Sequence, residues 1–238
     1  MPTPTYTVTC TDIQRLTKEI YEVHFGKPEG FRFKAGQFIL FEVPLVDNPA
    51  DIQTRAYSIA STPHETELLF LIKITPGGRM SRFLEEKLAV GSMLVMKGPF
   101  GLFTIPDEHD RDILFIATST GVAPFRSQVM DLIHKSKKHR MDLVFGVRSE
   151  EDVFWHKDLA ALSGAHEHFF LHLALSQPSP AWTGHRGRVQ TLVPSIVDDF
   201  TSKSIYVCGS PNMTKDVKVL CLSQWGATKE QVHIEGYI

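Results

Sequence analysis

The hydrophobic and polar positions of the chain change their spacing near residue 107. Before that point, short runs alternate with a period of two, as in residues 21–25, where Tyr, Val and Phe alternate with Glu and His. Such alternation places the apolar side chains on one face of a strand. Glycine and proline residues separate these runs, as turns require. The pattern predicts strands at 21–25, 38–43, 67–75 and 92–97, and one helix at 81–88.

After residue 107 the pattern alternates between strand and helix. A continuous apolar run at 112–117 is followed by a segment in which Phe125, Val129 and Leu132 recur at the spacing of one helix face. Further strands are expected at 141–147, 168–175, 204–208 and 231–235, and further helices at 154–162, 189–197 and 213–225. Strands that alternate with helices imply crossover connections and a parallel sheet covered on both faces.

These two patterns predict a fold of two domains. Residues 1–106 are expected to form an antiparallel β-barrel, and residues 107–238 an α/β domain with a parallel, Rossmann-like sheet. The linker is placed at 105–111. A chain of 238 residues buries on the order of 70% of its unfolded surface, so the fold needs no disulfide or metal to hold it together.

Composition and charge exclude several function classes. The 25 Lys and Arg residues against 27 Asp and Glu residues give a net charge of −2, which argues against a dedicated nucleic-acid binder. Cys10, Cys208 and Cys221 are too few for a disulfide framework or an iron–sulfur cluster. No apolar run approaches the roughly 20 residues needed to span a bilayer, and no secretion signal is evident. We therefore expect a cytoplasmic protein without a membrane span.

The connection at residues 117–124 has the features of a phosphate-binding turn. Its small residues, among them Thr120 and Gly121, follow a buried strand, and Pro124 suits the first turn of the next helix. Free N–H groups at a helix start attract phosphate, and ligands of open α/β folds bind at the carboxyl ends of the strands. A plain tight connection between strand and helix gives the same pattern. This turn alone leaves nucleotide binding open.

Five motifs follow one another in an order that resembles the ferredoxin–NADP⁺ reductase family of flavoproteins. They are Phe33-Lys34-Ala35-Gly36-Gln37-Phe38, Arg55-Ala56-Tyr57-Ser58, Gly77-Gly78-Arg79-Met80-Ser81, Gly98-Pro99-Phe100-Gly101 and Cys208-Gly209-Ser210-Pro211-Asn212-Met213. The resemblance covers nearly the whole chain. It implies that the first domain binds FAD, that the second binds NADH or NADPH, and that hydride passes between nicotinamide and flavin.

The chemistry of a flavin dinucleotide suits the residues of the second motif. Arg55 is expected to bind the pyrophosphate through two hydrogen bonds, because the N–H groups of a planar guanidinium are spaced to match phosphate oxygens. Tyr57 is expected to stack on the flavin ring, and Ser58 to hydrogen-bond the ring nitrogen that receives hydride. Ala56 lies between them. Because alternate strand residues share a face, a strand end or bend must reorient one of these side chains.

The third motif is expected to hold the flavin pyrophosphate at a helix start. The resemblance assigns this role to Gly78, Arg79, Met80 and Ser81, with backbone N–H groups from Met80 and Ser81 and the hydroxyl of Ser81. A simple helix cap at Ser81, with Glu85 in the following turn, is compatible with that role.

The resemblance places Cys208 and Gly209 beside the nicotinamide, where Gly209 leaves room for the ring. A buried small hydrophobe is the alternative for Cys208. Plant-type members of the family end in Glu-x-aromatic, and this chain ends Glu235-Gly236-Tyr237-Ile238, one residue longer. Tyr237 is therefore expected to shield the flavin and Glu235 to assist proton movement through Ser58. A frayed terminal strand is the alternative.

The choice between NADH and NADPH depends on the residues that follow the third strand of the second domain. Members that prefer NADPH often carry a Ser-Arg pair there, and this chain has Ser176-Gln177. Arg148, together with Arg186 and Arg188, offers a replacement cation. We favour NADH. Ser119, where many relatives have glycine, is a further departure in the phosphate-binding turn.

The remaining motifs point to surface positions rather than to chemistry. His166, His168 and His172 are expected on one strand face, without partners spaced for a metal. The basic run at 134–140 follows a predicted helix end, where cations are favourable, although it also suits docking of an acidic electron carrier.

The sequence thus predicts a flavin-dependent NAD(P)H oxidoreductase without a metal site. Its electrons pass to or from a separate acceptor, which is a ferredoxin, a flavodoxin, an oxygenase component or free flavin. Two alternatives stay open. One is a stand-alone flavin reductase that treats flavin as a substrate, and the other is a sensory or electron-transfer subunit of a larger complex.

Overall fold

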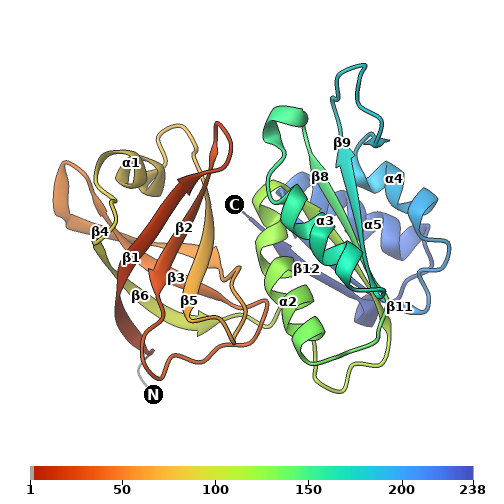
Figure 1. Ribbon diagram of the computed structural model, residues 1–238, viewed down its shortest axis with the longest axis horizontal. Helices are drawn as coiled ribbons and strands as arrows, with labels where there is room; N and C mark the ends of the chain where they lie inside the picture. Colours follow the sequence, from red (N-terminus) through yellow and green to blue (C-terminus); the bar gives the residue numbers. More distant parts are fainter. Residues whose placement is uncertain (1–2, 238) are drawn as a thin grey trace. The chain divides into compact units, whose positions relative to one another are not determined.

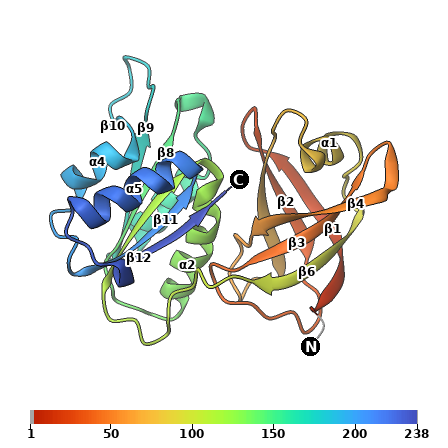
Figure 2. The same ribbon diagram turned by 180° about the vertical axis from the view of Figure 1, so that it is seen from behind.

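Two six-stranded sheets form the two units of the chain, for which the computed structural model describes residues 3–237 (Figures 1 and 2). The first unit comprises Met1–Ile105 and Arg126–Asp131, and the second comprises Pro106–Phe125 and Leu132–Ile238. The segment Arg126–Asp131 lies within the range that the sequence assigns to the second domain. Ile238, the extra terminal residue, lies outside the described residues.

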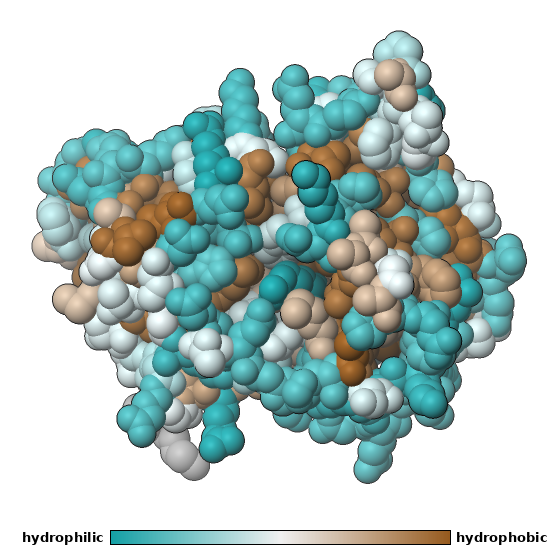
Figure 3. All heavy atoms as spheres, in the orientation of Figure 1, coloured by the Kyte–Doolittle hydropathy of each residue, from teal (hydrophilic) through white to brown (hydrophobic). Residues whose placement is uncertain are grey.

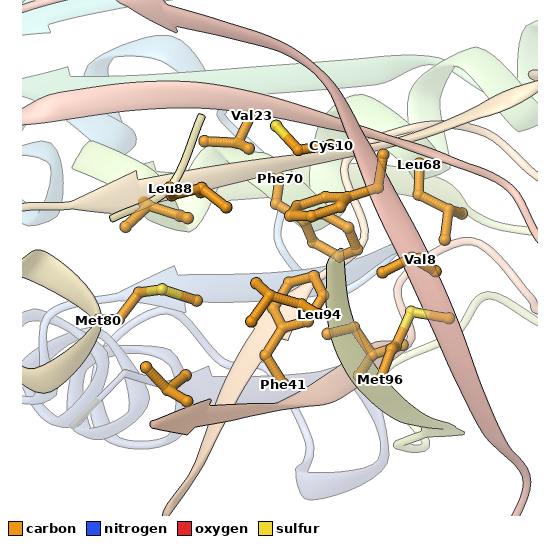
Figure 4. Packing of buried hydrophobic residues seen from close by; sticks show 14 of the residues in the cluster. Val8, Cys10, Val23, Phe41, Leu68, Phe70, Met80, Leu88, Leu94 and Met96 are labelled. Atoms are coloured by element: carbon orange, nitrogen blue, oxygen red, sulfur yellow. The ribbon is translucent and has the colours of Figure 1, made fainter. Parts of the chain in front are cut away.

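The first unit is an antiparallel sheet curled around an apolar core. Its elements are β1 (Thr5–Arg15), β2 (Ile20–Gly26), β3 (Phe38–Leu45), β4 (Asn48–Ser58), β5 (Glu67–Lys73), α1 (Arg79–Glu86) and β6 (Met93–Phe100). The strand order is β4-β3-β6-β1-β2-β5. Phe41 packs against Phe25 and Phe70 at ring-centroid distances of 5.0 Å each, and Figure 4 shows Phe41 and Phe70 among the aliphatic side chains of this core. The predicted antiparallel β-domain is confirmed.

Two strands of this unit, β1 and β4, are missing from the predicted set. In β1 only Val8 and Cys10 are buried, and the positions between and beside them are threonines, so apolar alternation is weak. β4 begins with Asn48 and Pro49, residues typical of turns, and its first positions are exposed. Pairing with neighbouring strands, rather than local pattern, makes these segments extended.

The second unit is a parallel sheet with helices on both faces. Its strands are β7 (Asp112–Thr118), β8 (Met141–Val147), β9 (Phe169–Leu175), β10 (His185–Arg186), β11 (Lys203–Gly209) and β12 (Val232–Gly236). Its helices are α2 (Ala123–His134), α3 (His156–Ala165), α4 (Val189–Ile196) and α5 (Pro211–Ser223), with short 3₁₀ turns at Ser119–Val122, Glu150–Asp152 and Lys229–Gln231. The strand order is β10-β9-β8-β7-β11-β12, and all pairings are parallel.

The helices pair up on opposite faces of this sheet. Figure 1 shows α2 and α3 in front of it, and Figure 2 shows α4 and α5 on the reverse face. Val193 of α4 and Val217 of α5 belong to one buried cluster with Ile116 and Val207 of the sheet. Because both faces are covered, every residue of the central strand β8 is buried. The predicted α/β domain is confirmed.

No helix within residues 3–237 is long and apolar enough to cross a membrane. The face shown in Figure 3 carries mostly hydrophilic and neutral residues, with smaller apolar areas between them.

Candidate functional site

The motif that contains Arg55 and Ser58 forms the end of β4. Pairing with β3 is regular here, with Phe41 opposite Arg55 and Phe38 opposite Ser58. Arg55 and Tyr57 therefore share one face of the strand, and Ser58 lies on the other. The pairing stays regular up to Ser58, which is the last residue of β4, so no bend interrupts the motif.

Tyr57 presents a neutral phenol ring at the rim of the barrel core. Its ring centroid lies 6.0 Å from that of Phe41, and the side chain is half-buried. Burial raises the pKa of Tyr57, and the charge of Arg55 opposes this only in part. The ring therefore stays uncharged at neutral pH. Ser58 is 5% exposed.

A pocket of about 400 Å³ lies in the first unit beside this strand. The lining comes from the end of β3 and the turn after it (Leu45, Val46), from β4 (Gln53, Arg55), and from the turn before α1 and that helix itself (Gly77, Gly78, Arg79, Arg82). The pocket thus unites three predicted cofactor residues, Arg55, Gly78 and Arg79. Tyr57 and Ser58 are outside its lining.

The guanidinium of Arg79 is held by Asp51 of β4. Nη1 donates to the carbonyl oxygen of Asp51 at 2.6 Å, and Nη2 lies 3.0 Å from its Oδ2. The Arg79 side chain is 9% exposed. It therefore ties the strand to the helix start and brings positive charge to the pocket wall.

Gly78 packs closely against the side chains of its own turn. A β-carbon there would lie 2.4 Å from Thr75 Oγ1 and 2.8 Å from Ser81 Oγ. Ser81 Oγ accepts a hydrogen bond from the backbone N–H of Thr75 at 2.9 Å. The predicted helix start at residue 81 and the alternative of a simple cap at Ser81 are both wrong, because the helix begins at Arg79 with Gly78 as its N-cap. Met80, expected to offer its backbone N–H, packs its side chain into the core at 3% exposure.

Arg82 and Gln53 are pocket residues that the motifs do not include. Arg82 contacts the carboxylate of Asp47, and its Nε donates to Glu86 Oε1 at 2.7 Å. Gln53 Oε1 accepts from Arg55 Nη2 at 2.9 Å. One signal for Arg82 was present in the sequence, since it follows Arg79 by three residues and therefore shares its helix face.

All candidate residues of the second unit lie at the carboxyl ends of parallel strands. Thr120 and Gly121 follow β7, Arg148 follows β8, Ser176 follows β9, Cys208 and Gly209 end β11, and Glu235 and Tyr237 lie at the end of β12. The sheet reverses its order of strand addition between β7 and β11, so this edge has a topological switch point there.

Gly121 packs directly against the end of β11. A β-carbon at Gly121 would lie 2.3 Å from the carbonyl oxygen of Cys208, and one at Gly209 would lie 2.2 Å from Thr118 Oγ1. The backbone N–H of Ser210 donates to that same Thr118 oxygen at 3.3 Å. These glycines therefore let the two strand ends approach closely at the switch point.

The turn after β7 has the expected helix start and one strained position. Pro124 is the second residue of α2, where the missing N–H of proline costs nothing. Ser119, at a position where relatives often have glycine, has a φ of 51°, in the left-handed region that favours glycine. Thr120 is 9% exposed.

Cys208 lies beside the last described residues of the chain. It is fully buried and stands opposite Glu235 in the parallel ladder, and the backbone N–H of Tyr237 donates to the Gly209 carbonyl at 3.0 Å. Burial raises the pKa of Cys208, the charge of Glu235 raises it further, and a side-chain hydrogen bond with Tyr237 opposes both. Cys208 is therefore a neutral thiol at physiological pH.

Arg148 lies beside Ser176 and Gln177, because the backbone N–H of Gln177 donates to the Arg148 carbonyl at 2.7 Å. Its Nε donates to Gln177 Oε1 at 3.0 Å, and the Ser176 N–H donates to the Val147 carbonyl at 3.1 Å. Both Arg148 and Ser176 are exposed. The guanidinium of Arg186, by contrast, donates to the carbonyls of Ser179 and Pro180, each at 3.0 Å.

The expectation that three histidines share one strand face is wrong. Only His172 belongs to β9, and its Nε2 lies 3.0 Å from Asp142 Oδ1. His166 and His168 precede the strand. Within residues 3–237, no group of three or more His, Cys, Asp or Glu side chains is placed to hold a metal ion.

Two family models together match most of the chain. The oxidoreductase FAD-binding domain matches residues 8–105, and the oxidoreductase NAD-binding domain matches residues 115–219. The first match lies within the first unit, and the second covers the second sheet from within β7 through β11, without β12.

Similar proteins include reductases and reductase components. A ferredoxin–NADP reductase of Sorangium cellulosum is 32% identical over 234 residues, which cover 94% of this chain and 94% of that protein. The reductase component of a phenol 2-monooxygenase from Pseudomonas is 27% identical over 93% of this chain. The match spans 62% of the length of that relative. A crystal structure of a Neisseria gonorrhoeae ferredoxin NADP⁺ reductase with bound FAD and NADP has a TM-score of 0.85 at 22% identity and 98% coverage of both chains.

Proposed function

Because the chain belongs to the ferredoxin–NADP reductase-like family of FAD- and NAD-binding oxidoreductases, we propose that it oxidises NADH or NADPH through FAD and reduces a separate electron acceptor. The acceptor is a ferredoxin, a flavodoxin or an oxygenase component. The observation that carries this proposal is the pocket that unites Arg55 with the glycine turn before α1, inside the range that matches an FAD-binding domain.

The lining of this pocket suits the pyrophosphate of FAD. Arg55 and Arg79 supply fixed positive charge, and Gly78 allows a close approach to the backbone at the helix start. Tyr57 offers a flat, uncharged ring for stacking, and Ser58 a hydroxyl for a flavin ring nitrogen. FAD held by these residues would supply the redox chemistry that links reduced nicotinamide to the electron acceptor.

The carboxyl edge of the second sheet is the proposed nucleotide site. The turn with Thr120, Gly121 and Pro124 receives the nucleotide phosphates, and Cys208 with Gly209 borders the nicotinamide. Because Cys208 is a buried neutral thiol, its role is to shape the site rather than to attack the substrate.

Glu235 and Tyr237 are proposed to act in the same reaction. They lie next to Cys208 and Gly209 in the ladder. Glu235 is proposed to assist proton movement, and Tyr237 is proposed as the aromatic cover that yields to nicotinamide.

NADH is the proposed nucleotide. Ser176-Gln177 lacks the arginine that would pair with the extra phosphate of NADPH, and the neighbouring Arg148 is already hydrogen-bonded to Gln177. The proposed compartment is the cytoplasm, in keeping with three buried cysteines that form no disulfide.

The test is anaerobic mixing of the purified full chain with each nucleotide while the flavin absorbance is recorded. The expected results are a yellow protein that retains FAD through gel filtration and rapid bleaching by NADH. A chain that stays colourless after incubation with FAD and FMN would contradict the proposal. Flavin that is lost on gel filtration but turned over as a substrate would support the free-flavin reductase instead.

A further inference from the structure

Two basic features of the sequence that the proposed function does not use meet at one pocket of the second unit. One is the basic run that follows α2, and the other is the pair His166 and His168 before β9. A pocket of about 510 Å³ is lined by Lys137 and Lys138 of the run and by both histidines. Such a volume falls in the range of small-molecule sites.

The pocket lies at the edge of the sheet opposite to the nucleotide site. Met141, which lines it, is the first residue of β8, and Val147 ends that strand next to Arg148. At about 3.3 Å per residue, the two ends of the strand lie roughly 20 Å apart. A ligand here would therefore not compete with a nucleotide at the carboxyl edge.

Hydrogen-bond donors predominate in the polar part of the lining. Lys137 and Lys138 provide ammonium groups, and His166 and His168 provide imidazole nitrogens. The Nζ atom of Lys137 is held at this edge by a 2.7 Å hydrogen bond to the carbonyl oxygen of Asp107. The donor set favours an anionic head group.

The remainder of the lining is apolar. It is formed by Ile133 near the end of α2, Met141 at the start of β8 and Ala165 at the end of α3. Met141 is 1% exposed, and its flexible side chain adapts to irregular shapes. A ligand that gains from both parts of the lining has a charged end and a compact apolar body.

We propose that this pocket binds a small organic anion, a carboxylate or phosphate carried on a compact apolar group. Two features of the site limit the affinity. Glu167 also lines the pocket and lies 3.4 Å from His168 Nε2, and the negative ends of α2 and α3 face this edge. These charges offset part of the lysine charge, so a dissociation constant on the order of 1 mM is expected for simple probes.

The test uses nuclear magnetic resonance on the isotope-labelled full chain, with any flavin it holds and with saturating NAD⁺. Benzoate, phenyl phosphate and benzyl alcohol are titrated separately. Both anions are expected to shift amide signals of residues 133–141 and 165–168, and neutral benzyl alcohol to bind about tenfold more weakly, the equivalent of about 1.4 kcal/mol. The tighter of the two anions identifies the preferred head group.

Substitutions separate a built site from general attraction of anions. Lys138→Gln is expected to weaken benzoate binding about two- to fivefold, as loss of a solvent-exposed ion pair would. Lys218→Gln, on the exposed side of α5 and outside the lining, is the matched control and should leave binding unchanged. Equal binding of benzoate and benzyl alcohol, shifts at other segments, or equal effects of the two substitutions would overturn the proposal.

Discussion

Gly121 and Cys208 approach so closely that a β-carbon on the glycine would lie 2.3 Å from the carbonyl oxygen of the cysteine. They belong to two different motifs, one after β7 and one at the end of β11, and the parallel pairing of those strands brings them together. The contact gives Gly121 a packing role that its place in a phosphate-binding turn does not reveal. It also makes the switch point of the sheet sensitive to a single methyl group.

Replacing this glycine tests the packing role. Gly121→Ala should lower the free energy of unfolding by about 1–3 kcal/mol, the usual cost of overpacking a buried site. Urea unfolding followed by circular dichroism measures the change. Gly164→Ala is the control, because a β-carbon there would meet nothing within 4 Å beyond its chain neighbours and the backbone of its own helix, and alanine is the better helix former within α3. Equal effects of the two substitutions would refute the close-contact argument.

Removal of the Arg55 guanidinium tests the proposed flavin pocket. Arg55→Ala should raise the dissociation constant for FAD about 10- to 100-fold, because a charge-assisted hydrogen bond contributes about 1.5–3 kcal/mol. Arg55→Lys keeps the charge but not the planar fork, and an intermediate affinity is expected. Quenching of flavin fluorescence measures binding. Arg32→Ala is the control, because Arg32 is exposed and is not part of the pocket lining. An unchanged affinity for FAD in Arg55→Ala would show that Arg55 does not belong to the flavin site.

The nucleotide preference should respond to position 177. Gln177→Arg adds a cation beside Ser176 and removes the hydrogen-bond acceptor of Arg148, so two guanidinium groups become available for the extra phosphate of NADPH. The ratio of kcat/KM for NADPH to that for NADH is expected to rise about tenfold or more, the effect of about 1.4 kcal/mol. Gln224→Arg, at the end of α5, is the charge-matched control. A ratio that moves equally in both variants would place the ribose elsewhere.

A buried carboxylate makes the stability of the second unit dependent on pH in the acid range. Asp142, whose side chain is 1% exposed, accepts hydrogen bonds from Arg140 Nε at 2.8 Å and lies 3.0 Å from His172 Nε2. Burial raises the pKa of Asp142, but the hydrogen bonds from His172 and Arg140 and their charges outweigh it and lower the pKa to about 2. The folded state thus prefers the ionised form more than the unfolded chain does.

The sign of the pH effect follows from this lowered pKa. The contribution of Asp142 is complete above the unfolded pKa of about 3.9 and is lost as the pH falls towards 2. Asp142→Asn should therefore cost on the order of 2 kcal/mol at pH 7 and progressively less below pH 4. Unfolding by urea at pH 7, 4 and 3 provides the measurement. A cost that stays constant across this range would mean that the ionised form is not what stabilises the fold.

The sequence predicted the class of the fold and most of its elements because their signals are local. Apolar side chains recur every two residues in a strand and every 3.6 residues in a helix, and this spacing follows from the backbone geometry of a few residues. Both ends of β8, Met141 and Val147, were therefore predicted correctly. α2 is found from one apolar face. Signals that depend on neighbours were missed, as for β1, whose many threonines hide its pairing. The start of α1 was placed two residues late for the same reason, since the turn held by Thr75 and Ser81 is not visible in the motif.

The sequence by itself determined which residues follow the ends of strands and in what order the motifs occur. Only the tertiary structure decided which of them meet. Strand pairing places Cys208 opposite Glu235, and two bonds from Arg79 to Asp51 join α1 to β4. The reason is physical. The spacing of apolar and polar residues depends only on the local segment, whereas contacts between distant segments form only when the whole core packs and each buried polar group finds a partner.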